Sequence, residues 1–244
     1  MMPRIKNWDN RTWISSKQYI LSFNNFLLKQ KKLNKQSRIL DIGCGRGKIM
    51  GSLLSKLRLA NKPIGLDIEN HKDVDKRILF KNINAIKYLK NNKKNFDLIL
   101  IKQTIHLFNL GEIRKLLDYA YLNLEPNGMI LIMSLDPKNN EIPTFSLMKE
   151  KLRQSFNKET IIRQNILRFQ KKIIFSKFNF KVNITKKKYI KMIEQRFISS
   201  LLKLSANQIL KGIEEIESRY KNSITFKDKL NCMIIKKPSF FSDN

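Results

Sequence analysis

A glycine-rich stretch at residues 38–48, RILDIGCGRGK, constrains the fold of this chain more than any other segment. A short apolar run there ends in Asp41, three glycines follow at alternate positions, and a segment with helical periodicity begins directly afterwards. Gly43, Gly45 and Gly47 are therefore expected on a tight turn between a buried strand and a helix. The missing side chains would let the backbone of this turn approach a ligand closely.

A second short apolar strand, residues 63–67, follows the glycine turn and ends in Asp67. An acid at the tip of a second strand is where a ribose would present its two hydroxyl groups. The turn and this acid together predict a nucleoside-binding half-site.

The glycine spacing excludes two phosphate-binding motifs. A dinucleotide fingerprint would need a glycine at the position of Lys48. A P-loop would need a glycine in place of Ile42 and a hydroxyl in place of Ile49. The acid before the turn, Asp41, would attract a cationic amine or sulfonium and repel a pyrophosphate.

The pattern Asp-x-Gly-x-Gly-x-Gly resembles the first motif of the class I, Rossmann-like S-adenosylmethionine-dependent methyltransferases. The resemblance covers residues 36–136, with an apolar run at 96–101, a leucine-rich helix, the Pro126-Asn127-Gly128 turn and a strand at 129–133. It implies S-adenosyl-L-methionine as the cofactor. In style the chain is most similar to small-molecule methyltransferases such as the trans-aconitate type.

The same resemblance implies an α/β fold with a doubly wound, seven-stranded and mostly parallel sheet, an N-terminal helix and a helical cap insertion. Residues 178–184 and 230–235 are expected to be the sixth and seventh strands, with the seventh antiparallel. We expect one methyltransferase domain in four parts: an N-terminal helical cap (1–35), a cofactor-binding core (36–136), a helical cap with the sixth strand (137–228), and the last strand and tail (229–244).

Helices are predicted at both ends of the core. Aromatic and aliphatic residues from Trp8 onward recur at near-helical spacing up to residue 30, and Ser15 or Ser16 could start the main helix. Residues 137–175 read as helical and charged, and an amphipathic helix is predicted from about Ser205 to residue 220.

Candidate cofactor-binding residues lie where the first four strands end. Asn84 and Ala85 stand where the family has an Asp-Ala pair whose polar side chain reaches the adenine. Alternatively, Asn84 only caps the helix that starts at Ala85. The candidate set is Asp41, Gly43, Cys44, Gly45, Gly47, Asp67, Ile68, Asn84, Ala85 and Lys102.

Methyl transfer requires mainly that the acceptor be aligned with the methyl carbon, and it needs a base only if the acceptor carries a proton. Arg196 could clamp a carboxylate in bidentate fashion, or it could be a surface arginine paired with Glu194. His106 is a candidate base or orienting group, or else a helix-terminal histidine with structural bonds only. His71 is expected to be solvated in a polar loop. The candidates for the acceptor site are His106, Gln103, Arg196 and Tyr19.

Two absences narrow the acceptor. Residues 101–104 (IKQT) lack the Asn/Asp-Pro-Pro-Tyr/Phe turn that enzymes acting on exocyclic amines of bases carry after the fourth strand. Neither Cys44 nor Cys232 lies in a motif for carbon-5 pyrimidine methylation. We therefore expect a small polar acceptor, preferably anionic. An RNA- or protein-modifying methyltransferase and a non-catalytic cofactor-fold binding protein remain as alternatives.

The formal net charge of +29 is the one feature that favours a different partner. Such a balance can indicate nucleic-acid contact, but the lysines are spread along the whole chain and no lysine cluster interleaves aromatics with arginine as a base-stacking surface would. Abundant lysine, asparagine and isoleucine are also what an AT-rich coding sequence produces. We expect a solvated surface and no specific nucleic acid, with attraction of anionic substrates as the alternative.

The remaining expectations concern compartment and assembly. Two cysteines far apart suggest neither a disulfide nor a metal site. No run approaches the roughly 20 apolar residues of a membrane span, and the N-terminus has no hydrophobic signal core. A cytoplasmic, metal-independent monomer or homodimer is expected.

Overall fold

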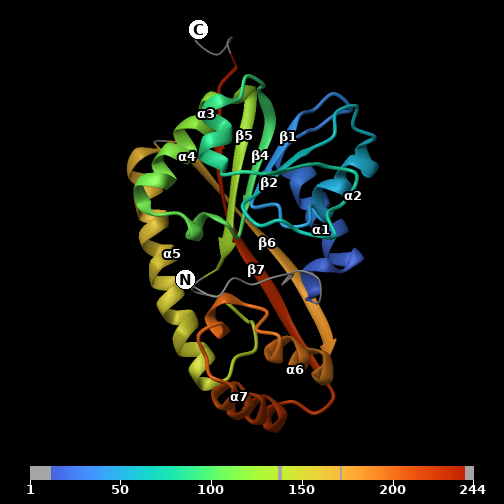
Figure 1. Cartoon of the computed structure of the whole chain (residues 1–244), viewed down its shortest axis with the longest axis vertical. Coiled ribbons are helices and arrows are strands. Elements are labelled where there is room, and N and C mark those ends of the chain that lie inside the picture. Colours follow the sequence, from blue (N-terminus) through green and yellow to red (C-terminus); the bar gives the residue numbers. More distant parts are fainter. Residues whose placement is uncertain (1–11, 137–138, 171, 240–244) are drawn as a thin grey trace. The chain divides into compact units, whose positions relative to one another are not determined.

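The computed structural model describes residues 12–136, 139–170 and 172–239 (Figure 1). Trp8 and the tail from residue 240 lie outside the described residues. The strands are β1 (Ile39–Ile42), β2 (Ile64–Asp67), β3 (Leu79–Asn82), β4 (Phe96–Lys102), β5 (Leu124–Leu135), β6 (Ile173–Thr185) and β7 (Ser223–Lys236). The helices are α1 (Lys17–Gln30), α2 (Lys48–Leu57), α3 (Ala85–Asn91), α4 (Leu110–Leu122), α5 (Ser146–Phe169), α6 (Lys186–Glu194) and α7 (Ala206–Arg219).

The seven strands form one mixed sheet in the order β3-β2-β1-β4-β5-β7-β6. The first five strands in this order, β3, β2, β1, β4 and β5, are each parallel to their neighbours, and β7 is antiparallel to β5. In the register of the central strands, Leu40 lies opposite Ile64 on one side and Ile99 on the other. The predicted seven-stranded, mostly parallel α/β sheet is confirmed, and so is its antiparallel last strand.

The described residues divide into two compact units. One, the sheet unit, comprises residues 20–135, 162–178 and those from 230 onward. The other, the aromatic unit, comprises residues up to 19, 136–161 and 179–229. The expectation of a single domain stays a prediction.

One hydrophobic cluster of the sheet unit lies on one face of the central strands, while alternate residues such as Leu98, Leu100 and Leu131 are buried on the other face. Leu40, Ile99 and Ile130 point to the face of this cluster, where α3, α4 and the end of α5 cover them. Because side chains alternate along a strand, Asp41 points to the opposite face. The ring of Phe23, on α1, lies 5.5 Å from Lys102 Nζ, at the end of β4.

The aromatic unit is built around rings that meet edge to face. Trp13 packs against Phe197 and Phe226 with centroid distances of 5.6 and 4.9 Å, and its Nε1 donates to Asp228 Oδ2 at 2.9 Å. The predicted amphipathic helix is confirmed as α7, which begins after a capping box formed by Ser205 and Gln208. A cap role for the helices of this region stays a prediction.

Three strand predictions need correction. The Pro126–Gly128 turn lies inside β5, where a register shift between the pairs of Phe96 and Leu98 accommodates it. Strands β6 and β7 extend beyond the predicted 178–184 and 230–235. Buried and exposed residues alternate in these extensions: in β7 the buried residues Ile224, Phe226 and Asp228 are separated by exposed ones. A search for continuous apolar runs therefore misses the extensions.

The start of α1 agrees with the prediction. The Ser16 hydroxyl accepts a hydrogen bond from the Tyr19 amide at 3.2 Å, directly before the helix begins at Lys17. Within the described ranges, no helix combines the length and the apolar character that crossing a membrane requires.

Candidate functional site

The glycine turn connects β1 to α2, as predicted. Gly43, Gly45 and Gly47 all have positive φ angles, of 72°, 54° and 68°. A Cβ atom on Gly43 would lie 2.2 Å from Thr104 Oγ1, so this position requires both the glycine conformation and the glycine volume. The turn therefore packs directly against the loop that follows β4.

Hydrogen bonds attach the turn to the end of β2. The amides of Gly43 and Cys44 donate to Leu66 O at 2.8 and 3.0 Å. The amide of Gly45 donates to Asp67 Oδ2 at 2.9 Å, and the amide of Glu69 donates to Asp67 Oδ1, also at 2.9 Å. A carboxylate oxygen accepts more than one hydrogen bond, so Asp67 retains capacity for ligand hydroxyl groups.

Asp41 is a buried carboxyl group at the base of the turn, with only 5% of its surface exposed. Burial raises the pKa of Asp41 from 3.8 to about 7; the Lys102 ammonium acts against this shift and the Asp67 carboxylate adds to it. Lys102 Nζ donates to Gln103 Oε1 at 3.3 Å. A bound cation next to Asp41 would stabilise its charged form.

Asn84 is the N-cap of α3, because its side-chain oxygen accepts from Lys87 N at 3.1 Å. The capping alternative is thus what the structure shows, and contact with adenine stays a prediction. Ala85 is buried at the first helical position. Ile68, directly after Asp67, is 56% exposed and offers an apolar surface there. The thiol of Cys44 packs against Gly65, where a Cβ atom would lie 2.7 Å from Sγ.

Gln103 and His106 lie in the segment after β4, on either side of Thr104, whose side chain lies against Gly43. Gln103 has a φ of 53°, an uncommon conformation for a non-glycine residue, and its amide donates to Met133 O at 2.7 Å. His106 is half-buried in a short 3₁₀ turn at Ile105–Leu107. Strained backbone of this kind concentrates at functional sites.

The other two acceptor candidates, Tyr19 and Arg196, belong to the aromatic unit. Tyr19 is fully buried, and its burial together with the nearby Asp228 carboxylate raises its pKa well above the usual value. Arg196 Nη1 donates to Leu201 O at 2.6 Å, so the guanidinium closes a backbone turn. Their roles toward an acceptor stay predictions.

Sequence reasoning missed one residue of the sheet unit: the expectation that His71 is solvated is wrong. Its side chain is only 9% exposed, and its Nε2 lies 3.6 Å from Asp67 Oδ2. No local signal was available, because a spacing of four residues brings two side chains together only on a helix and this segment forms none.

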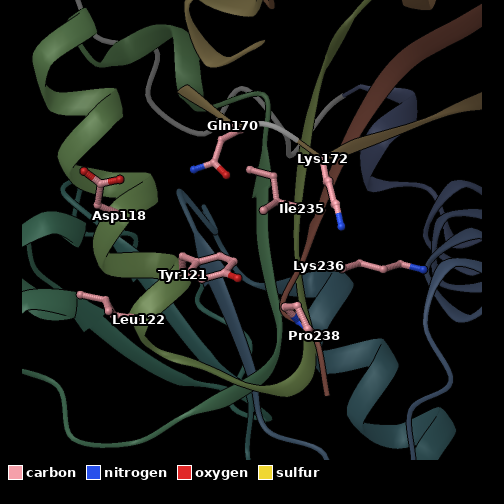
Figure 2. Close-up of a pocket in the computed structure, with 8 residues that line it drawn as sticks. All are labelled: Asp118, Tyr121, Leu122, Gln170, Lys172, Ile235, Lys236 and Pro238. Carbon is pink, nitrogen blue, oxygen red and sulfur yellow. The ribbon is translucent and has the colours of Figure 1, made fainter. Parts of the chain in front are cut away.

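No group of three potential metal ligands occurs among the described residues. Cys44 and Cys232 are both free. A pocket of about 470 Å³ lies between the end of α4 and the end of β7 (Figure 2). Lys236, which lines it, pairs with Met129 near the start of the parallel run of β5. The pocket therefore lies at the amino ends of the parallel strands. Folds of this kind bind their ligands at the opposite, carboxyl ends of these strands.

The chain belongs to the methyltransferase domain family, because the model of that family matches residues 13–166, more than half of its length. Family membership and the glycine turn with its two acids identify it as an S-adenosylmethionine-dependent methyltransferase of class I. No curated protein matched the chain.

Solved structures with the same fold agree with this assignment. The plantazolicin methyltransferase BpumL, crystallised with a pentazolic desmethylPZN analog and SAH, is 18% identical with a TM-score of 0.53, over 95% of this chain and 88% of that one. Phosphoethanolamine N-methyltransferase 2 of Haemonchus contortus is 19% identical with a TM-score of 0.50, over 97% and 61%. A SAM-dependent methyltransferase from Archaeoglobus fulgidus is 21% identical with a TM-score of 0.50, over 89% and 94%.

Proposed function

We propose that the chain transfers a methyl group from S-adenosylmethionine to a small polar, preferably anionic, acceptor by in-line displacement. The observation that carries the anionic preference is the Lys102 ammonium, which is hydrogen-bonded to Gln103 at the carboxyl end of β4. When the cofactor is bound, its own positive charge would offset the Asp41 carboxylate, so the Lys102 ammonium would still attract an anionic acceptor.

On this proposal the cofactor extends along the ends of β1, β2 and β3. Asp41 and the glycine turn would hold the cationic methionine part, with Cys44 and Lys102 beside it. Asp67 would accept hydrogen bonds from the ribose hydroxyls, and a charge-assisted pair of this kind is strong. Ile68, Asn84 and Ala85 would contact the adenine.

The chemical step makes few demands on the protein. The thioether leaves as a neutral molecule, so no acid has to protonate it, and the residues mainly align the acceptor and exclude water. His106 would act as a base where the acceptor carries a proton, and Gln103 would orient the acceptor. Arg196 would clamp an acceptor carboxylate. The raised pKa of Tyr19 keeps its hydroxyl neutral, so it could donate a hydrogen bond but would be a poor base.

One observation and one expectation support a small acceptor. The Haemonchus contortus enzyme was crystallised with phosphomonomethylethanolamine, a small molecule with an anionic phosphate. The resemblance in style to methyltransferases of the trans-aconitate type, which stays a prediction from the sequence, would also favour a small acid. The high positive charge instead favours RNA as a second candidate acceptor. Cytoplasmic location and a monomeric or homodimeric state stay predictions.

The test is methyl transfer from labelled S-adenosylmethionine to three fractions of a cell extract: metabolites, RNA and protein. We expect label in the metabolite fraction, strong loss with Asp67→Ala, and partial loss with His106→Ala or Arg196→Ala. Asp118→Ala, which removes an exposed carboxylate of α4, is the matched control. Label found only in RNA or protein would refute the small acceptor. Unchanged activity of the His106 and Arg196 variants would remove the acceptor site while leaving the cofactor site in place.

A further inference from the structure

The connection between β2 and β3 buries a histidine beside the ribose-binding acid. Residues 68–78 form no helix in the structure, yet the His71 side chain in this loop is only 9% exposed. Its ring meets Phe80 of β3 edge to face, with centroids 6.3 Å apart and an interplanar angle of 77°. The imidazole is therefore held in place by packing.

The ring nitrogen that faces Asp67 lacks a hydrogen bond. His71 Nε2 is buried and has no hydrogen-bond partner in the part of the chain that the structure describes. Its distance to Asp67 Oδ2, 3.6 Å, is too long for a direct hydrogen bond. Buried polar atoms are nearly always hydrogen-bonded, so an exception of this kind indicates an atom that is available to bind a ligand.

The acid opposite this nitrogen is fixed by its own contacts. Gly45 and Glu69 donate to its two carboxylate oxygens, and Asn82 Nδ2 donates to its backbone oxygen at 3.1 Å. The hydrogen bonds of Asp67 and the packing of His71 against Phe80 hold the two groups apart, at 3.6 Å between Oδ2 and Nε2. A hydroxyl group that approaches both could donate to the carboxylate and accept from Nε2–H.

We propose that His71 binds a hydroxyl of the cofactor ribose through Nε2, alongside Asp67. The inference rests on the proposed cofactor site and adds a specificity residue to it. The ligand class is a ribonucleoside with both hydroxyls: His71 and Asp67 together favour it over the corresponding deoxynucleosides.

The experiment measures binding of S-adenosylhomocysteine and of its 2′-deoxy and 3′-deoxy analogues by calorimetry. The proteins are the wild-type chain, His71→Ala, His71→Gln and Asn70→Ala. Glutamine can place an amide nitrogen near the position of Nε2, and Asn70 is an exposed neighbour in the same loop. Thermal unfolding of each variant reports separately on stability.

For S-adenosylhomocysteine we expect His71→Ala to weaken binding roughly tenfold, as for one lost hydrogen bond. His71→Gln should retain most of the affinity, and Asn70→Ala should match the wild type. With one of the two deoxy analogues the effect of His71→Ala should disappear, and with the other it should persist.

Equal weakening of all three ligands would overturn the contact, because a purely structural role of His71 would affect them alike. An unchanged affinity in His71→Ala would overturn it as well. In both cases the wild-type chain still binds S-adenosylhomocysteine and the proposed cofactor site stands. If the wild-type chain binds none of the three ligands, the cofactor site and the contact both fail.

Discussion

Replacement of Asp41 by asparagine should stabilise the protein at alkaline pH while it weakens the cofactor site. The folded chain raises the pKa of this carboxyl from 3.8 to about 7. Between these two values the folded state holds a proton that the unfolded state has released. Stability of the wild-type chain therefore falls with rising pH across this window. About three pKa units at 1.36 kcal/mol each give a loss of about 4 kcal/mol by pH 8.

Asparagine has nearly the same shape and stays neutral, so Asp41→Asn escapes this loss. Its free energy of unfolding should match that of the wild type near pH 4 and exceed it by up to about 4 kcal/mol at pH 8. The assay is urea unfolding at several pH values between 4 and 8.5. Asp118→Asn, on the exposed surface of α4, is the control and should follow the wild type throughout. A difference between Asp41→Asn and the wild type that stays constant with pH would refute the reasoning.

Three further outcomes are expected. Affinity for S-adenosylmethionine should fall by up to tenfold per unit as the pH drops below about 7, because the bound cation requires the ionised Asp41; calorimetry with Asp41→Asn should show a flat profile. Asp67→Ala should weaken binding of S-adenosylhomocysteine by about 1.5–3 kcal/mol through loss of bonds to a charged group, and a near-normal dissociation constant would count against the ribose assignment. Gly43→Ala should lower the melting temperature strongly, because the new Cβ would lie 2.2 Å from Thr104 Oγ1 and the backbone φ of residue 43 is 72°. An unchanged melting curve would contradict that packing.

The glycine turn between β1 and α2 was predictable because its signals are local. The spacing of the three glycines predicts the tight turn, and the acid before them predicts the charge beside it, so no contact with a distant segment has to be known. The seven-stranded, mostly parallel sheet with its antiparallel seventh strand followed from the resemblance that this turn carries. The helix start at Ser16 and the capping box at Ser205 were likewise readable from residues a few positions apart.

The missed features depend on contacts between distant segments. His71 is buried because Phe80, in the next strand, packs against it, and nothing near His71 in the sequence signals that contact. Tyr19 is enclosed by Phe180, whose ring centroid lies 5.1 Å away, and by Asp228, more than two hundred residues later. The Pro126–Gly128 segment keeps a turn-like conformation, with a φ of 61° at Asn127, but it lies inside β5 because pairing with β4 continues on both sides of it, at Leu124 and at Met129.

The position of β7 between β5 and β6 affects how the chain can be made (Figure 1). During synthesis from the N-terminus, β6 leaves the ribosome before the strand with which it pairs exists. Until residues 223–236 emerge, β5 presents an open edge to the cell and β6 has no neighbour in the sheet. Open strand edges pair readily with other chains. A nascent chain stalled before residue 223 should therefore depend on chaperones, although every candidate residue of its cofactor site has already been made.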